Sequence, residues 1–197
     1  MFTFLHAACG GNDKTRTTRE FATDEWKEVR LDSNSGFNPD ITASLIDMQL
    51  EPESFDAAYT AHSLERLYAH EVGTALANLY AALKPEGYLV LMCADVQAAC
   101  ALVAEDKLLE PAYESPAGPV APIDILYGFR PALAAGHKHL ACKCGFTTRA
   151  LMGTLAQAGF GSVWSARNPE AFSILTIASK EERSEDFMRE IAARHFA

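Results

Sequence analysis

The chain has 197 residues, of which 49% are hydrophobic and 22% charged, and its formal net charge is −9. These values are ordinary for a soluble globular protein and favour one domain. They disfavour nucleic-acid binding, because that affinity comes mainly from Lys and Arg side chains that neutralise phosphates. No window approaches 18 consecutive apolar residues, so we expect neither a membrane-spanning helix nor a membrane partner.

Two further features indicate the compartment. The N-terminus lacks a basic segment followed by a long apolar core, so no secretory signal peptide is predicted. An odd number of cysteines without such a signal indicates free thiols in a reducing cytoplasm. The cysteines are Cys9, Cys93, Cys100, Cys142 and Cys144.

The first part of the chain predicts short strands separated by polar loops. Residues 2–8 are apolar and run into Gly10-Gly11, which predicts a strand followed by a turn. Three more strands are expected at 28–32, 41–46 and 55–60.

The rest of the chain predicts helices alternating with strands. Leucines and tyrosines recur at spacings of three and four over residues 63–84, which predicts a helix. Five of the nine prolines fall in residues 111–145, which predicts a loop-rich insertion. The remaining predicted elements are a strand at 88–93, a helix at 96–109, a helix from Thr147 or Thr148 to Gly159, strands near 162–167 and 172–179, and an amphipathic helix at 181–195.

This alternation favours an α/β fold. Strands that alternate with helices form a mostly parallel sheet covered on both faces, and a terminal hairpin adds an antiparallel strand. Ligands of such sheets bind at the carboxyl ends of the strands.

Three positions at predicted strand ends fit an adenosine-shaped ligand. Gly10 follows the first strand, and a glycine there allows close approach to the backbone. Asp32 ends the second strand, where a carboxylate can bind both ribose hydroxyls. Asp47 follows the third and can bind an exocyclic amine, while Met48 can pack on the ring. Taken singly, each also fits a plain turn, a loop cap or a surface carboxylate.

The linked motifs resemble those of class I S-adenosylmethionine-dependent methyltransferases, in particular the small bacterial methyltransferase type 11 branch. The matching stretches are "LHAACGGN", "VRLD", "LIDMQLEPESFDAAYTAHSLERL", "LKPEGYLVLMCAD" and "GFTTRALMGTLAQAGFGSV". Together they cover about residues 3–180.

The resemblance implies a Rossmann-like, doubly wound fold with seven mostly parallel strands, an antiparallel last strand and a truncated N-terminus. The methyltransferase-like domain then spans 1–180, with the insertion at about 110–145, and 181–197 form a C-terminal amphipathic helix. The implied cofactor is S-adenosylmethionine. The residues expected to bind it are His6, Ala8, Cys9, Gly10, Asp32, Asp47, Met48 and Ala61.

Some residues depart from the family pattern. His6 stands where the family usually has an acidic residue that helps to hold the methionine part of the cofactor. Ala8 stands where glycine is usual, and so adds a methyl group at the closest approach. The helix that often precedes the first strand is also missing from this sequence.

Two residues after the fourth strand are candidates for the chemistry. In the resemblance His62 faces the methyl group, where its imidazole can orient or deprotonate an acceptor. Glu65 lies one turn further on and can face the same cleft. The alternatives are a capping or packed histidine and a solvated carboxylate.

The insertion holds two histidines and two thiols within residues 137–144. The spacing H-x-H-x2-C-x-C fits no familiar zinc motif, so we expect no metal site. A substrate-facing lid is favoured over a plain structural loop, with Tyr127, His137 and His139 as its polar contacts.

The favoured function is therefore a cytoplasmic S-adenosylmethionine-dependent methyltransferase acting on a small molecule. A catalytically silent subunit that binds the cofactor or a partner is the alternative. A nicotinamide-dependent oxidoreductase is disfavoured, because "GGNDKT" lacks the third glycine of that fingerprint. A homodimer is compatible with the sequence.

Overall fold

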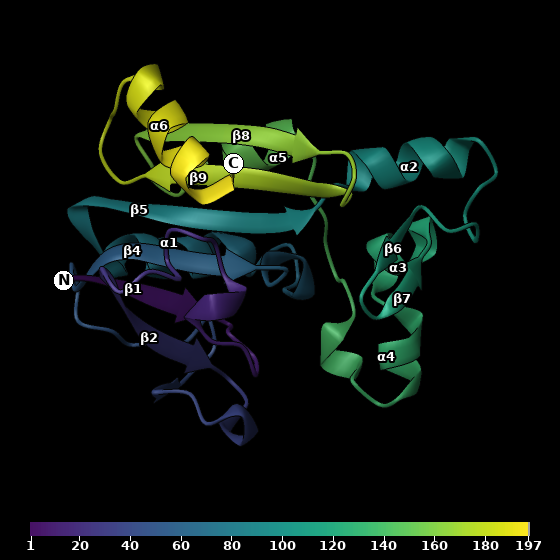
Figure 1. Ribbon diagram of the computed structural model, residues 1–197, viewed down its shortest axis with the longest axis horizontal. Helices are drawn as coiled ribbons and strands as arrows, with labels where there is room; N and C mark the ends of the chain where they lie inside the picture. Colours follow the sequence, from purple (N-terminus) through teal and green to yellow (C-terminus); the bar gives the residue numbers. More distant parts are fainter. Residues whose placement is uncertain (197) are drawn as a thin grey trace.

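Seven strands form the central sheet of the computed structural model, which describes residues 1–196 (Figure 1). Their order is β3-β2-β1-β4-β5-β9-β8. The strands are β1 (Phe2–Ala7), β2 (Trp26–Asp32), β3 (Ile41–Thr42), β4 (Phe55–Ala61), β5 (Leu83–Ala94), β8 (Ser162–Asn168) and β9 (Ser173–Ser179). The first five pair in parallel, and β9 runs antiparallel to both of its neighbours. The predicted fold class is thus confirmed.

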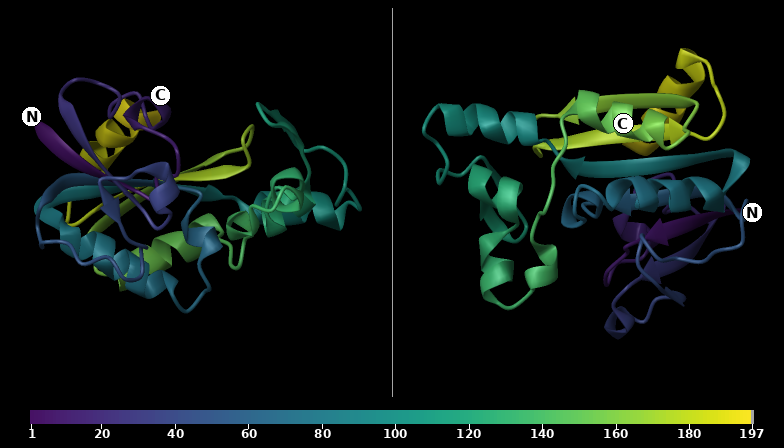
Figure 2. Two further views of the ribbon diagram at one scale, coloured as in Figure 1. Left: turned by 90° about the horizontal axis from the view of Figure 1, so that it is seen from below. Right: turned by 180° about the vertical axis from the view of Figure 1, so that it is seen from behind.

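Helices cover both faces of this sheet (Figure 2). On one face lie α1 (Val72–Ala82) and α5 (Thr148–Gln157), whose apolar side chains pack against those of β1 and β5. On the other face lies α6 (Glu185–Phe196), the predicted amphipathic helix. Alternate residues of each strand point to opposite faces, so Leu5 belongs to the first core and Phe4 to the second.

The α6 face is rich in aromatic side chains. Phe21, from the segment between β1 and β2, stacks on Phe4 with ring centroids 4.2 Å apart. The Phe21 ring also contacts the rings of Trp26 on β2 and His195 on α6. Phe21 thus connects the N-terminal third of the chain to α6. This packing places α6 firmly on the sheet.

Two predicted helices differ from those observed. The helix expected at 63–84 begins only at Val72, because the amide of Tyr68 donates to the Glu71 carboxylate and the chain must first turn back from the sheet edge. The helix expected at 96–109 is α2 (Val96–Ala104), which ends at a left-handed Asp106. Apolar spacing alone does not show where such turns fall.

The predicted loop-rich insertion contains regular structure. It forms a lobe beyond the carboxyl ends of β4 and β5 (Figure 1). Its elements are β6 (Tyr113–Ser115), β7 (Gly118–Val120), α3 (Pro122–Tyr127), α4 (Arg130–Ala134) and the 3₁₀ turn η4 (Lys138–Leu140). The amides of Lys143 and Cys144 donate to the carbonyl oxygen of Glu65, at 2.7 and 3.2 Å, and so fasten the lobe to the segment after β4.

Within residues 1–196, no helix has both the length and the apolar character needed to cross a bilayer.

Candidate active site at the carboxyl edge of the sheet

The loops after β1, β2 and β4 meet at one edge of the sheet. Parallel pairing of β1 with β2 and β4 brings their carboxyl ends side by side. The amide of Cys9 continues the pairing by donating to the Leu31 carbonyl oxygen at 3.1 Å. Gly10 and Asp32, two of the three positions that the sequence predicts at one ligand site, therefore lie side by side at this edge.

Asp32 is fixed at this edge by two backbone amides. Its Oδ2 accepts from Gly10 and its Oδ1 from Asn34, each at 2.8 Å. Each carboxylate oxygen offers two lone pairs, so each can accept one more hydrogen bond. The nearly buried carboxylate can thus receive two adjacent hydroxyl groups.

The turn after β1 leaves open space beside its backbone. Ala8 and Gly10 both have left-handed backbones, with φ of 54° and 57°. A Cβ added to Gly10 would meet no described atom within 4 Å, so a ligand can approach there. Ala8 holds its conformation at a cost of about 1–2 kcal/mol.

Arg30 joins this turn to the loop after β2. Its guanidinium donates to the carbonyl oxygens of Gly10, Asn12, Phe37 and Asn38, at 3.0 to 3.2 Å. The sequence analysis missed this role, because an arginine in an alternating strand also fits an exposed position. The contacts hold the two loops in one arrangement.

His6 lies on the α6 face of the sheet rather than in the open space. Its Nδ1 is 2.6 Å from Oε1 of Glu28, whose Oε2 accepts from the Lys14 amide at 3.0 Å. Burial lowers the pKa of His6, although Glu28 opposes that shift. In the family pattern an acidic residue stands on β1 at the position of His6. Here Glu28, on the neighbouring strand β2, places its carboxylate beside that position.

The other predicted cofactor residues differ in exposure. Asp47 is exposed, and its Oδ1 accepts from the hydroxyl and the amide of Ser44, which lower the pKa of Asp47. Met48 is buried in the core under α1, so little of its side chain can face a ligand. Cys9 is also buried, and burial raises the pKa of its thiol.

His62 follows β4 in a strained conformation. Its φ is 52°, in the left-handed region that costs a non-glycine residue about 1–3 kcal/mol. The amide of His62 donates to the carbonyl oxygen of Met92 on β5 at 2.9 Å, and this hydrogen bond holds the backbone in place. The side chain is half-exposed, and its Nδ1 lies 2.9 Å from Oε1 of Glu65.

Glu65 is 3% exposed, on the 3₁₀ turn η3 (Leu64–Arg66). Burial alone would raise its pKa, but the hydrogen bond and charge of His62, with the Ala94 amide at 3.2 Å, lower it on balance. Oε2 of Glu65 is buried and lacks a hydrogen-bond partner among the described residues. Because a carboxylate faces Nδ1, we assign the ring proton to Nδ1, which leaves Nε2 as an acceptor.

A cavity of about 250 Å³ opens beside this pair. His62 and Glu65 line it together with residues of the insertion and of the β8–β9 turn. The aromatic lining residues are Tyr113, Phe129 and Phe172. The sequence analysis missed Tyr113 and Phe172, because nothing in the chain order shows that the β8–β9 turn meets the insertion.

Three predicted substrate contacts lie elsewhere. Tyr127 is 63% exposed, and His137 and His139 are exposed at the tip of the lobe. None of the three is a lining residue of this cavity in the part of the chain that the structure describes. Their polarity suggested contacts, but the insertion turns them toward solvent. Among residues 1–196, no three His, Cys, Asp or Glu side chains are grouped so as to hold a metal ion.

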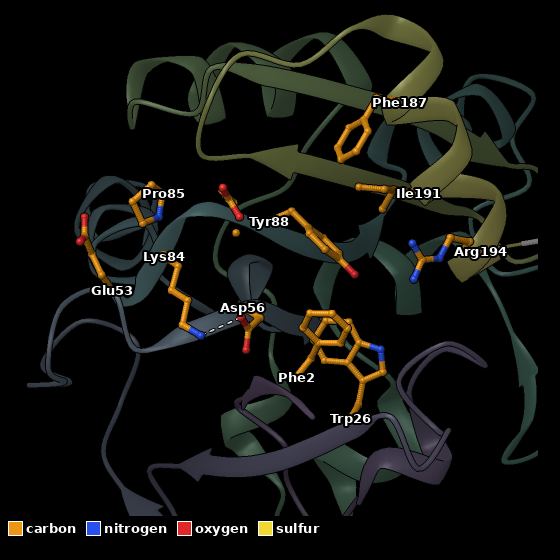
Figure 3. Close-up of a pocket in the computed structure, with 12 residues that line it drawn as sticks. Phe2, Trp26, Glu53, Asp56, Lys84, Pro85, Tyr88, Phe187, Ile191 and Arg194 are labelled. Carbon is orange, nitrogen blue, oxygen red and sulfur yellow. Dashed lines mark hydrogen bonds and ion pairs between the residues drawn. The ribbon is translucent and has the colours of Figure 1, made fainter.

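A second cavity, of about 430 Å³, lies at the opposite end of the sheet (Figure 3). Phe2 and Trp26 line it at the amino ends of β1 and β2, Tyr88 lines it from β5, and α6 contributes Phe187. Although larger, it is far from the strand ends that carry Asp32 and His62. Its charged lining includes the ion pair between Lys84 and Asp56, at 2.7 Å, rather than a histidine–carboxylate pair.

Comparisons with known proteins indicate the kind of domain to which these strands belong. Residues 5–91 match the family model described as "Methyltransferase domain". No curated protein shows significant sequence similarity to the chain.

Solved structures extend the likeness to the whole fold. A methyltransferase from Methanosarcina mazei, described as S-adenosylmethionine-dependent, is 14% identical with a TM-score of 0.60, over 92% of this chain and 93% of that chain. A Burkholderia thailandensis 1,6-didemethyltoxoflavin-N1-methyltransferase is 16% identical with a TM-score of 0.56, over 92% of this chain and 72% of that chain. At these identities the likeness shows the fold.

Proposed function

We propose that the protein transfers a methyl group from S-adenosylmethionine to a small-molecule acceptor. Residues 5–91 match a methyltransferase-domain family, and the chain has the class I methyltransferase fold. One observation carries the proposal. The Asp32 carboxylate and the His62–Glu65 pair lie at the same edge of the sheet, and a cavity opens beside that pair.

The residues at the edge fit the cofactor. Both oxygens of Asp32 retain acceptor capacity for the ribose hydroxyls, and the space beside Gly10 admits the ligand close to the backbone. Asp47 is exposed and can accept from the adenine amine. Ala61, at the end of β4, would line the path between cofactor and cavity. The structural neighbour from Burkholderia thailandensis, which holds S-adenosylhomocysteine, supports this assignment.

S-adenosylmethionine, when bound, supplies the methyl group on an electrophilic sulfonium. When an acceptor heteroatom takes the methyl group, Nε2 of His62 would take the proton that the acceptor loses, and the electron pair of the broken carbon–sulfur bond would stay on sulfur. Glu65 holds the ring with Nε2 toward the cavity and stabilises the imidazolium that forms. His62 is then the catalytic residue and Glu65 a positioning residue.

A small acceptor is supported by the size of the cavity and by the charge of the chain. The cavity volume of about 250 Å³ is slightly below the range of about 300–1,000 Å³ that is usual for ligand pockets. The net charge of −9 disfavours a nucleic-acid acceptor. The neighbour from Burkholderia thailandensis holds its own small acceptor, 1,6-didemethyltoxoflavin.

Location and assembly are further parts of the proposal. All five cysteines are free, which supports a reducing cytoplasm. A homodimer remains a proposal from the sequence, and analytical ultracentrifugation would test it.

The alternative function is a silent subunit that binds the cofactor without turnover. Two departures from the family pattern favour it: His6 pairs with Glu28 on the α6 face, and Ala8 adds a methyl group to the left-handed turn after β1. Cofactor binding with no turnover on any small acceptor would support this alternative.

The experiment that tests catalysis is release of S-adenosylhomocysteine from S-adenosylmethionine across a panel of small acceptors. We expect turnover by the wild type, and a loss of about 100-fold or more in His62→Gln. His70→Gln, at an exposed histidine, should retain activity. Equal turnover by the wild type and His62→Gln would exclude His62 as the base.

A further inference from the structure

We propose that the acceptor is a planar aromatic molecule of about one or two rings that carries an ionisable hydroxyl group. This inference rests on the proposed function and concerns the cavity beside His62. It adds the substrate class, which follows from the lining of the cavity.

The first observation is a pair of stacked rings in the wall. Tyr113 and Phe172 have centroids 5.8 Å apart and planes only 13° apart, and Phe129 lines the same cavity. Aromatic side chains favour aromatic partners by about 0.5–1.5 kcal/mol beyond the area buried. A flat ring therefore matches this wall better than a saturated one.

The second observation is that Phe172 is held in a strained conformation. Its φ is 48°, and its carbonyl oxygen accepts from the Asp95 amide at 2.8 Å. Asp95 is buried, caps α2 and pairs with Arg167 on β8. The backbone of Phe172 is thus held by the residue that caps α2, and backbone strain of this kind is concentrated at functional sites.

The third observation concerns charge. Both carboxylates that line the cavity have cationic or imidazole partners: Asp124 binds Arg130 at 2.7 Å, and Glu65 binds His62 at 2.9 Å. Arg66 lines the cavity as well, and no carboxylate within 4.0 Å pairs with it among residues 1–196. Arg66 is therefore a lining cation without a carboxylate partner among those residues, and its guanidinium can stabilise an oxyanion.

These observations together favour a hydroxyl group. A base held by a buried carboxylate is needed when the acceptor must lose its proton early, as a phenolic hydroxyl does. In that step the hydroxyl oxygen bonds to the methyl carbon, the carbon–sulfur electron pair stays on sulfur, and the hydroxyl proton moves to Nε2 of His62. Arg66 then lies close enough to the cavity to stabilise the developing phenolate.

The test uses 2-naphthol as the probe, with trans-2-decalol and 2-methoxynaphthalene as controls. Binding is measured by calorimetry with and without S-adenosylhomocysteine. We expect saturable binding of 2-naphthol, and weaker binding of the saturated alcohol and of the ether. Phe172→Leu and Tyr113→Leu should each weaken 2-naphthol binding about three- to tenfold. Phe187→Leu, at the other cavity, should leave it unchanged.

The absorption band of bound 2-naphthol provides a second readout. We expect a larger ionised fraction on the wild type than on Arg66→Met at the same pH. Absence of saturable binding, equal binding of trans-2-decalol, or no effect of Phe172→Leu and Tyr113→Leu would overturn the inference. If 2-naphthol binds as expected but S-adenosylmethionine does not bind, the proposed function fails while the aromatic site stands.

Discussion

Nδ1 of His62 lies 2.9 Å from Oε1 of Glu65, and that carboxylate is almost completely buried under the insertion. The residues belong to one chain segment, but the lobe that covers them comes from 40 or more residues further on. This relationship favours the tautomer with the ring proton on Nδ1, which leaves Nε2 as an acceptor.

Glu65→Gln tests the relationship directly. A glutamine can turn its NH₂ group toward Nδ1 and select the wrong tautomer, as in the serine-protease triad. We expect kcat to fall by about tenfold or more with little change in KM, measured by release of S-adenosylhomocysteine. Glu86→Gln, at an exposed carboxylate, should match the wild type. A change confined to KM would assign Glu65 to substrate binding instead.

Gly128→Ala should disrupt the lobe. Gly128 has φ of 102°, and an added Cβ would lie 2.7 Å from the Leu140 carbonyl oxygen. The matched control is Gly136→Ala, where φ is 98° but a Cβ would meet no described atom within 4 Å. We expect Gly128→Ala to lose about 1–3 kcal/mol more stability than Gly136→Ala in urea unfolding. Equal losses would mean that the α3–η4 packing is not rigid.

Glu28→Ala should destabilise the sheet. The substitution leaves Nδ1 of His6 and the Lys14 amide without their carboxylate partner. A buried polar group left unpaired costs about 1–3 kcal/mol, which urea unfolding at neutral pH would measure. Glu25→Ala, at an exposed glutamate nearby, should cost far less. Equal effects of the two variants would show that the buried pair contributes nothing.

His195 makes the stability depend on pH. Burial lowers its pKa to about 4, from 6.5, and its ring nitrogens contact Thr18 and Tyr88. Between these pH values the unfolded chain binds the proton and the folded chain does not. The contribution of His195 to the free energy of unfolding is therefore complete above about pH 6.5. It falls by roughly 3 kcal/mol as the pH drops to about 4.

Urea unfolding at several pH values would measure this slope. His195→Gln should reduce it, and part should remain because burial lowers the pKa of His6 in the same direction. The exposed His70 serves as the control, and His70→Gln should keep the full slope. A slope that His195→Gln does not change would contradict the assignment.

The strands and their alternation with helices follow from patterns that a sequence displays, although β3 covers only Ile41–Thr42 of the strand expected at 41–46. Leu89, Val90 and Leu91 are all fully or almost fully buried, as a continuous apolar run predicts for a central strand. The positions of Gly10 and Asp32 followed from the same strand ends. The start of α1 did not, because Leu64 and Leu67 keep a helical spacing although the 3₁₀ turn ends at Arg66 and Leu67 is extended.

The cavity was harder to predict, because it depends on contacts between distant segments. Tyr113 and Phe172 stack across 59 positions of the chain, and neither belongs to a motif. His137 and His139 stood out by composition, yet side-chain polarity does not distinguish a lid contact from an exposed tip. The left-handed conformations of His62 and Phe172 also leave no trace in residue type.

The most direct test of the central claim is calorimetry of S-adenosylhomocysteine binding to the wild type and to Asp32→Asn. The account predicts saturable binding to one site on the wild type and at least about tenfold weaker binding to Asp32→Asn. Asp186→Asn, on the exposed side of α6, should bind like the wild type. Absence of binding to the wild type, or equal affinity in Asp32→Asn, would contradict the placement of the cofactor at the carboxyl edge of the sheet.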